Sequence, residues 1–466
     1  MVVGQIPEPA DLLVVGAGPG GYAAALHAAR LGRKVTLVDR DGESGVGGVC
    51  LHRGCIPSKA LIELADHLDG TRRFAAAGLH VDAARPDLSV FQSWKAGIVD
   101  RLADGIRGLL SSGDVTVVAG TCRLTRSNQV AMKTPDDRVR FFEFADAVIA
   151  TGSRPSPPPG LEPDGASVLD TTGILELQQV PESLLVVGAG SSGVELGTAY
   201  AKLGSRVTLV EQDTRILPGL EPSLSSQVRR RLDQLGVTVL TGSEVTDVEA
   251  GQARVKGPDS EQRVAAATVL VAVGRRPNSD ELGLEDIGIT PRPDGLLAVN
   301  TDRRLSEHLA AIGDVTPGPA LAHKATAEAR VAAEALSGRR AAFDPQAVPV
   351  VVYSDPEIAS AGLTVTEARA AGMSVRTAAY PLGASGRAAT VGSTQGSARL
   401  VIDADTDTIA GVHLVGPHAS ELIAEGVLAI EMAATAEDLV LSIHPHPTLS
   451  EQFAEVAGAA VHARSG

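Results

Sequence analysis

Leu12-Leu13-Val14-Val15-Gly16-Ala17-Gly18 decides the fold of this chain, because it recurs almost letter for letter as Leu184-Leu185-Val186-Val187-Gly188-Ala189-Gly190. Each copy is a short apolar run that ends in the glycine pattern G-x-G-x-x-G, and a helix-like segment and a second apolar run follow. The pattern glycines are Gly16, Gly18 and Gly21 in the first copy and Gly188, Gly190 and Gly193 in the second. A strand, a tight glycine turn and a helix in this order predict one β-α-β unit in each copy.

Each copy also places an acidic residue at the end of its second apolar run. Val35–Val38 is followed by Asp39, and Val207–Val210 is followed by Glu211. The glycines let the backbone approach a pyrophosphate at the helix N-terminus, and an acid about 20 residues further on can accept a hydrogen bond from a ribose hydroxyl. One such pattern alone is often only a tight strand–helix turn. Two complete copies predict two dinucleotide sites.

The second acid bears on the choice of nicotinamide cofactor. A carboxylate at Glu211 would repel the 2′-phosphate of NADP, so this site favours NAD. Arg206 and Arg215 flank the same strand and leave an NADP site open as the weaker alternative.

Length, charge and composition exclude several classes of protein. The 466 residues predict roughly three domains of about 150 residues each. The formal net charge of −15 argues against nucleic acid or an anionic membrane as a partner, because both favour basic surfaces. No apolar run approaches the ~20 residues of a membrane-spanning helix, and Met1–Gln5 lacks the layout of a secretory signal. We therefore expect a cytoplasmic α/β enzyme that binds neither nucleic acid nor membrane.

Two of the three cysteines, Cys50 and Cys55, follow shortly after the first glycine pattern. A chain this poor in cysteine does not use disulfides as staples, so a close pair beside a nucleotide site suggests redox chemistry. Five residues of regular helix rise about 7.5 Å, whereas disulfide-linked Cα atoms lie roughly 4.4–6.8 Å apart. If the pair bridges, the helix must be distorted between them, and Gly54 is the expected place. Pro57 suits a first helical turn, which would put Cys55 near a helix N-terminus that favours a thiolate.

The alternatives for the cysteine pair are a structural zinc site and plain burial. Zinc would need two further ligands at short spacing, and Cys122, in a strand-like context, is badly placed to supply one. No metal site is therefore predicted.

The segment Gly47–Lys59 resembles the active-site stretch of the pyridine nucleotide–disulfide oxidoreductase family, in particular the branch that oxidises dihydrolipoyl groups. Further segments resemble the same family in the same order, over essentially the full length. They are Val118–Thr121, Ala150–Ser153, Val273–Asn278, Ala311–Val315, Leu321–Ala325 and Val352–Glu357.

The resemblance implies an α/β fold with two Rossmann-like dinucleotide-binding domains, for FAD and NAD, and a C-terminal α+β dimerisation domain. The expected division is 1–153 for the first part of the FAD domain, 154–275 for the NAD domain, 276–346 for the return to the central domain and 347–466 for dimerisation. It implies that Asp314 holds the ribityl chain and that Lys59 lies near the flavin ring, paired with Glu195. The cofactor-binding residues expected are Gly16, Gly18, Gly21, Asp39, Lys59, Gly120, Asp314, Ala322, Gly188, Gly190, Gly193, Glu195, Glu211 and Gly274.

The same resemblance assigns catalytic roles. Cys50 exchanges with a dithiol substrate and Cys55 faces the flavin. A free thiol is only about 3% thiolate at pH 7, so a base is needed. His446 matches that base, Glu451 matches the carboxylate that orients its ring, and His444 is expected to support them. In the family the base comes from the other subunit, which implies a homodimer with a shared active site. The other interpretation of this histidine segment is a metal site or a surface turn.

The implied activity is oxidation of protein-bound dihydrolipoyl groups with reduction of NAD. The implied partner is the lipoyl domain of the acyltransferase of a 2-oxo acid dehydrogenase complex. The alternatives are a reductase of a small disulfide of the glutathione or mycothiol type, and a mainly structural subunit of such a complex. The chain departs from the family pattern at His52-Arg53, at Ser191-Ser192 and at Asp39, which predicts side reactions with other acceptors or weaker NAD binding.

Overall fold

The computed structural model describes residues 6–82, 84–249 and 251–465, and these form two compact units. The first unit takes in the described residues up to Ala60, Ser89–Ser156 and Gly274–Asp344; the second takes in Leu61–Leu88, Pro157–Val273 and the chain from Pro345 onward. Met1–Gln5, on which the expectation about a secretory signal depends, lie outside the described residues. The division into four functional segments stays a prediction.

The first unit is built on an eight-stranded sheet with the order β17-β18-β6-β1-β2-β3, extended through β5 and β4 from β6. β1 (Glu8–Val15) runs parallel to β2 (Val35–Asp39) and to β6 (Val139–Ile149). Leu12, Leu13 and Val14 have no exposed surface, as expected for a parallel strand covered on both faces. The remaining strands of this unit are β3 (Thr116–Ala119), β4 (Thr121–Arg126), β5 (Gln129–Lys133), β17 (Arg304–Ser306), β18 (Leu309–Ala311), and the separate pair β7 (Ser153–Pro155) and β16 (Arg275–Pro277).

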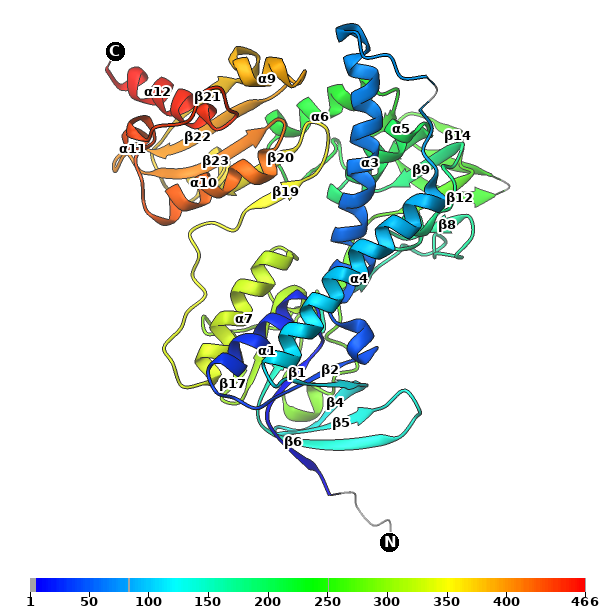
Figure 1. Ribbon diagram of the computed structural model, residues 1–466, viewed down its shortest axis with the longest axis vertical. Helices are drawn as coiled ribbons and strands as arrows, with labels where there is room; N and C mark the ends of the chain where they lie inside the picture. The colour runs from blue at the N-terminus through cyan, green and yellow to red at the C-terminus, as the bar shows by residue number, and fades with distance from the viewer. Residues whose placement is uncertain (1–5, 83, 250, 466) are drawn as a thin grey trace. The chain divides into compact units, whose positions relative to one another are not determined.

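Small side chains let two helices of the first unit pack closely against each other. α1 (Pro19–Arg30) and α7 (Ala322–Leu336) lie side by side (Figure 1), and alanines from both belong to one buried cluster with β1 and β2. The alanine-rich contact compensates for the scarcity of aromatic residues in the chain. The other elements of the unit are α2 (Gly48–Arg53), α4 (Leu88–Ser112), η1 (Gly42–Gly45), η4 (Glu285–Ile287) and η5 (Gly313–Val315), while α3 (Cys55–Arg73) begins here and continues into the second unit.

The second unit repeats the strand–turn–helix–strand arrangement of the first. β9 (Ser183–Val187), α5 (Ser191–Leu203) and β10 (Arg206–Val210) correspond to β1, α1 and β2, which confirms the predicted internal repeat. Their sheet is parallel, with the order β11-β10-β9-β15-β8. The other strands of this sheet are β8 (Val168–Leu169), β11 (Thr238–Leu240) and β15 (Thr268–Val271). This part of the second unit also contains α6 (Pro222–Gln234), η2 (Phe74–Ala77) and η3 (Gly173–Glu176). A separate antiparallel sheet is formed by β12 (Glu244–Glu249), β13 (Gln252–Lys256) and β14 (Glu261–Ala265).

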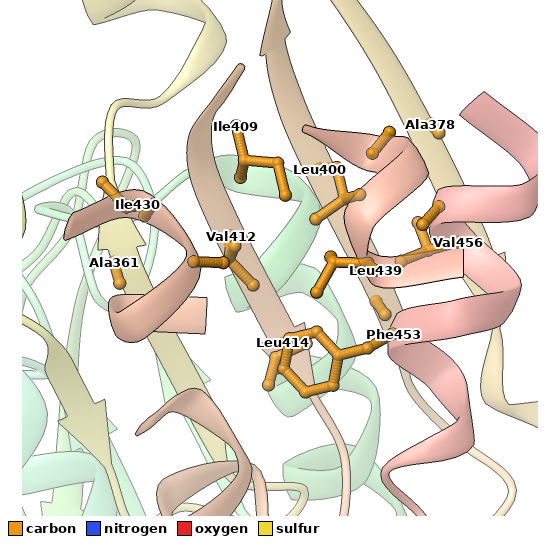
Figure 2. Close-up of a cluster of buried hydrophobic side chains, with 14 of the residues drawn as sticks. Ala361, Ala378, Leu400, Ile409, Val412, Leu414, Ile430, Leu439, Phe453 and Val456 are labelled. Atoms are coloured by element: carbon orange, nitrogen blue, oxygen red, sulfur yellow. The ribbon is translucent and has the colours of Figure 1, made fainter. Parts of the chain in front are cut away.

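The C-terminal part of the second unit is an antiparallel sheet with the order β19-β20-β23-β22-β21, packed against helices. Figure 2 shows its core, where Leu400 and Leu414 of the sheet meet Leu439 of α11 and Phe453 and Val456 of α12. The elements are β19 (Val350–Val352), β20 (Ile358–Gly362), β21 (Val375–Pro381), β22 (Ser397–Asp403), β23 (Ile409–Val415), α8 (Val365–Ala370), α9 (Gly386–Thr390), α10 (Ala419–Glu431), α11 (Ala436–Leu441), α12 (Glu451–Ser465) and η6 (Leu382–Ala384).

The structure therefore confirms the predicted fold class: α/β, with two β-α-β nucleotide folds and a C-terminal α+β part. Within the described ranges, the chain has no helix with both the length and the apolar character to cross a lipid bilayer.

Candidate active site

The first glycine turn joins β1 to α1 and leaves room for a phosphate group. Gly16 has φ +101, and a Cβ there would lie 2.3 Å from the carbonyl oxygen of Ala150. A Cβ at Gly21 would lie 1.7 Å from the carbonyl oxygen of Gly16, so only glycine permits this approach. A Cβ at Gly18 would meet nothing within 4 Å, and no side chain caps the α1 N-terminus at that residue. Gly188, Gly193 and Gly190 repeat these three relations at the start of α5.

Each predicted acid accepts a hydrogen bond from the turn of its own copy. The backbone N–H of Ala17 donates to Asp39 Oδ2 at 2.9 Å, and that of Ala189 donates to Glu211 Oε2 at 2.6 Å. A carboxylate has about four acceptor positions, so each still has positions for a ribose hydroxyl. Open, uncapped helix N-termini beside these acids fit a dinucleotide at both turns.

The two arginines beside the second turn already have partners. Arg206 pairs with Glu182 at 3.0 Å on the surface, and Arg215 donates to the carbonyl oxygens of Pro218 at 2.7 Å and Leu220 at 2.5 Å. Glu211, in contrast, accepts directly from the backbone of the glycine turn. This arrangement favours NAD over NADP.

Glu211→Gln is expected to lower kcat/KM for NAD by about 10-fold, because a hydrogen bond to a charged acceptor contributes about 1.5–3 kcal/mol. It should also narrow the preference for NAD over NADP, since the carboxylate that repels a 2′-phosphate is gone. Steady-state kinetics with both cofactors measure the two effects. Asp213→Asn, an exposed carboxylate two residues on, is the matched control and should change neither value. An unchanged preference for NAD over NADP in the Glu211 variant would show that this carboxylate does not bind the ribose of the cofactor.

Asp314 lies in the first unit beside the two chain segments where β7 and β16 pair. Ser153 Oγ donates to Asp314 Oδ2 at 2.5 Å and accepts from Arg275 Nε at 2.8 Å. Thr151 and Asn278 exchange two further hydrogen bonds across the same segments, at 2.7 and 2.9 Å. The structure thus brings together three segments that the sequence marked separately.

A buried carboxylate that the sequence did not predict holds the turn before Asp314. Glu328 of α7 has no exposed surface and accepts from the backbone N–H of Gly313 at 2.6 Å. It also pairs with Arg303 at 3.0 Å and with Lys324 at 3.3 Å. Lys324 Nζ in turn donates to the carbonyl oxygen of Gly313 at 3.1 Å. The i,i+4 spacing of Lys324 and Glu328 was the only signal of this network in the sequence.

Glu328→Gln is expected to destabilise the protein by about 3–5 kcal/mol, because it leaves two buried cations without a counter-charge. We also expect FAD to dissociate at lower temperature, since the Gly313 peptide loses its charged acceptor. Thermal unfolding followed by flavin fluorescence measures both. Glu334→Gln removes a carboxylate from the same helix that pairs with the exposed Arg330 and with His27 of α1, each at 3.2 Å, and should cost about 1 kcal/mol, well below the loss at Glu328. Equal effects from the two variants would contradict this role of Glu328.

The cysteine pair lies where two helices meet at a break. α2 ends at Arg53, Gly54 adopts φ −139 and ψ −106, and α3 begins at Cys55, so the helix is interrupted at the predicted residue. The two cysteines are not joined by a disulfide in the structure, and Cys50 is half-buried while Cys55 is exposed. The pKa of Cys50 is raised, first by its side-chain hydrogen bond with Cys55 and then by burial, while Lys59 opposes the shift. The two thiols are therefore close enough to share a hydrogen bond.

The two residues that depart from the family pattern between the cysteines contact the loop before α2. His52 Nε2 donates to the carbonyl oxygen of Val46 at 2.8 Å. Arg53 lies 3.6 Å from Asp41, and both side chains are about half exposed. The backbone N–H of Gly47 in this loop donates to the carbonyl oxygen of Ala17 at 2.9 Å. His52 thus ties the cysteine helix to the first glycine turn.

The predicted base and its carboxylate are in direct contact. His446 Nδ1 lies 2.7 Å from Glu451 Oε1, and the backbone N–H of Thr448 donates to Glu451 Oε2 at 2.7 Å. The pKa of Glu451 is lowered, first by the hydrogen bond from His446 and then by that from Thr448. Because Nδ1 donates to the carboxylate, Nε2 is the nitrogen left to take a proton.

The other predicted residues lie on both units. Gly120 follows β3 and its N–H donates to the carbonyl oxygen of Asp39 at 2.8 Å, and Ala322 is the first residue of α7. Gly274 has φ +139 next to β16.

Lys59 belongs to the first unit and Glu195 belongs to the second. Glu195 is buried and accepts a hydrogen bond from the backbone N–H of Tyr353 at 2.9 Å. Their pairing stays a prediction, as does the meeting of Cys50 with His446.

The part of the chain that the structure describes holds no group of three or more side chains placed to bind a metal ion.

Two family descriptions match the chain. Residues 10–329 match "Pyridine nucleotide-disulphide oxidoreductase", and residues 348–457 match the dimerisation domain of the same name. Among curated proteins, the chain is similar to dihydrolipoyl dehydrogenase of Geobacillus stearothermophilus, with 43% identity over 99% of each chain. It is also similar to dihydrolipoyl dehydrogenase 2 of Haloarcula marismortui, with 44% identity over 100% of each chain, and to dihydrolipoyl dehydrogenase of Bacillus subtilis, with 41% identity over 99% of this chain and 98% of that one.

Solved structures agree with these matches. LpdA of Mycobacterium tuberculosis superposes with a TM-score of 0.90 and 27% identity, over 96% of this chain and 99% of that one. The flavoprotein disulfide reductase RclA of Escherichia coli shares the fold, with a TM-score of 0.84 and 23% identity over 96% of this chain and 99% of that one. The family uses FAD and NAD, the two cofactors expected from the glycine turns. The chain belongs to the pyridine nucleotide–disulphide oxidoreductase family.

Proposed function

We propose that this chain oxidises protein-bound dihydrolipoyl groups to lipoyl groups and reduces NAD⁺ to NADH. The observation that carries the proposal is the hydrogen-bonded pair Cys50 and Cys55 at the α2–α3 break, in the same unit as the first glycine turn. Full-length relatives with 41–44% identity are dihydrolipoyl dehydrogenases, which supports the choice of substrate.

The chemistry at sulfur follows from the residues present. His446 Nε2 takes a proton from one substrate thiol, and the thiolate attacks Cys50 of an oxidised Cys50–Cys55 disulfide. This forms a mixed disulfide and releases Cys55 as a thiolate. The second substrate thiol then attacks the substrate sulfur of the mixed disulfide, which closes the lipoyl ring and frees Cys50. Two electrons pass from the substrate dithiol to the protein dithiol, and the two substrate protons pass to His446 and to the released thiols.

The cofactors would be held by residues already described. Gly16, Gly18, Asp39 and Asp314 would hold FAD, and the second turn with Glu211 would hold NAD. When bound, FAD supplies electron transfer between the protein dithiol and the nicotinamide. The chain's contribution is to hold the pyrophosphates at open helix N-termini and the riboses at the acids.

A homodimer with a shared active site is part of the proposal. The matched dimerisation domain supports the dimer. Large apolar side chains are exposed on α10, directly after it, on α11 and in the segment after α11. A second copy of this chain is the partner we propose for them: Leu428, Met432, Leu441 and Ile443. In such a dimer His446 of one subunit would serve the cysteines of the other. The lipoyl-domain partner and the cytoplasmic location also stay proposals.

Two measurements on the purified protein test the function. Its spectrum should be that of a bound flavin. NAD⁺ reduction should be fast with dihydrolipoamide and slow with reduced glutathione or mycothiol. Faster turnover of NADPH with a small disulfide than of NAD⁺ with dihydrolipoamide would instead establish the small-disulfide reductase. A protein that binds flavin but oxidises neither kind of thiol would point to the structural subunit.

A further inference from the structure

Among the described residues, one side-chain hydrogen bond joins the segment that carries His446 to an element other than α11 and α12. Residues 442–450 form no helix or strand between α11 and α12. Within the described residues, most of the hydrogen bonds of this segment join residues at most five positions apart, such as Thr448 with Pro445 and Ser450. The exception is His444 Nε2, which lies 2.7 Å from Glu425 Oε1 on α10. His444 is only 8% exposed at its side chain, whereas His446 is 79% exposed.

Both ring nitrogens of His444 face hydrogen-bond acceptors. Nδ1 lies 3.0 Å from the carbonyl oxygen of Ser442, and Nε2 lies 2.7 Å from the carboxylate of Glu425. These two contacts hold the ring between the backbone of its own segment and α10. His446 differs, because Nδ1 alone is engaged and Nε2 has no partner among the described residues.

We propose that His444 is a positioning residue for the His446 base: its ring bridges Ser442 and Glu425 and so fixes the 442–450 segment against α10. This inference rests on the proposed function. The ends of the segment are anchored in the core through Leu439 of α11 and Phe453 of α12 (Figure 2). Between those anchors, the bond to Glu425 sets where the segment lies, and the local bonds set only its internal shape.

His444 is also among the causes that lower the pKa of Glu451, after the hydrogen bonds from His446 and Thr448. The ring therefore acts on the carboxylate that orients His446.

Two activities of one preparation test the proposal. NAD⁺ reduction by dihydrolipoamide needs His446, whereas NADH oxidation by ferricyanide needs the cofactor sites but no thiol exchange. In His444→Phe we expect kcat with dihydrolipoamide to fall about 10- to 100-fold, since displacement of a catalytic group by about 1 Å costs up to about 100-fold. KM for dihydrolipoamide and the ferricyanide rate should stay within about 2-fold of the unchanged protein.

Further variants test the proposal if His444→Phe does not fold. Glu425→Gln keeps an amide acceptor for His444 but removes the carboxylate, and should lower the same kcat by a smaller factor. Glu421→Gln is the control, because it removes an exposed carboxylate one turn earlier on α10 and should change nothing. His444→Phe combined with Glu425→Gln should cost no more than His444→Phe alone, because both remove one contact.

Three outcomes would overturn the inference. Equal losses of NAD⁺ reduction by dihydrolipoamide and of NADH oxidation by ferricyanide would show that the pair His444 and Glu425 only stabilises the fold. An unchanged kcat in both single variants would show that the pair does not position His446. If the unchanged protein lacks dihydrolipoamide activity but oxidises NADH with ferricyanide, the proposed function itself fails, and the inference fails with it.

Discussion

Cys50→Ser is expected to lower dihydrolipoamide-dependent NAD⁺ reduction by about 10⁴-fold or more, the scale seen when a covalent nucleophile is removed. A serine hydroxyl cannot form the mixed disulfide, so no electrons leave the substrate. FAD binding should persist, because the first glycine turn, Asp39 and Asp314 are untouched. Steady-state turnover with dihydrolipoamide, together with the flavin absorbance of the same sample, measures both effects.

Cys122→Ala is the matched control for this loss. Cys122 lies on β4, where burial raises its pKa to about 12, so it is an inert thiol at neutral pH. Its replacement should leave turnover intact. Retention of more than about a tenth of the activity in Cys50→Ser would show that electrons reach the flavin without this cysteine, against a loss of the size expected for a nucleophile.

His446→Gln is expected to lower the same turnover by about 10³-fold near pH 7, within the range found for removal of a general base. The glutamine cannot take the proton of the substrate thiol. The loss should shrink as the pH rises through the ordinary thiol pKa near 8.5, because the substrate then loses its proton to water. A pH series of kcat for the variant and the unchanged protein measures this recovery.

His462→Gln controls for the loss of a histidine, since His462 is exposed on α12 and its Nδ1 lies 2.7 Å from the carbonyl oxygen of Gly458. It should behave as the unchanged protein does at each pH. A loss in His446→Gln that is the same at pH 7 and at pH 9 would mean that His446 does something other than deprotonate the substrate.

The features that the sequence predicted are local or repeated. The two glycine turns, their strands and the acids at Asp39 and Glu211 follow from short patterns whose geometry is set within about 25 residues. The break at Gly54 followed from helix rise, disulfide geometry and the backbone freedom of glycine. The contact of His446 with Glu451 also spans only five positions.

The features that the sequence did not predict depend on chain segments that meet only in the fold. Glu328 looks like one half of a surface i,i+4 pair with Lys324, and its burial against Gly313 and Arg303 is set by the packing of α7 on the sheet. The bond of His444 to Glu425 joins residues 19 positions apart on different elements. Neither pairing has a spacing rule that sequence patterns could reveal.

The most direct measurement is an anaerobic reductive titration of the oxidised protein, counting electrons per flavin. A redox-active Cys50–Cys55 disulfide takes up two electrons and the flavin takes up two more, so we expect roughly four per subunit, falling to roughly two in Cys50→Ser. An uptake of only about two electrons by the unchanged protein would contradict the assignment of these cysteines as the electron relay.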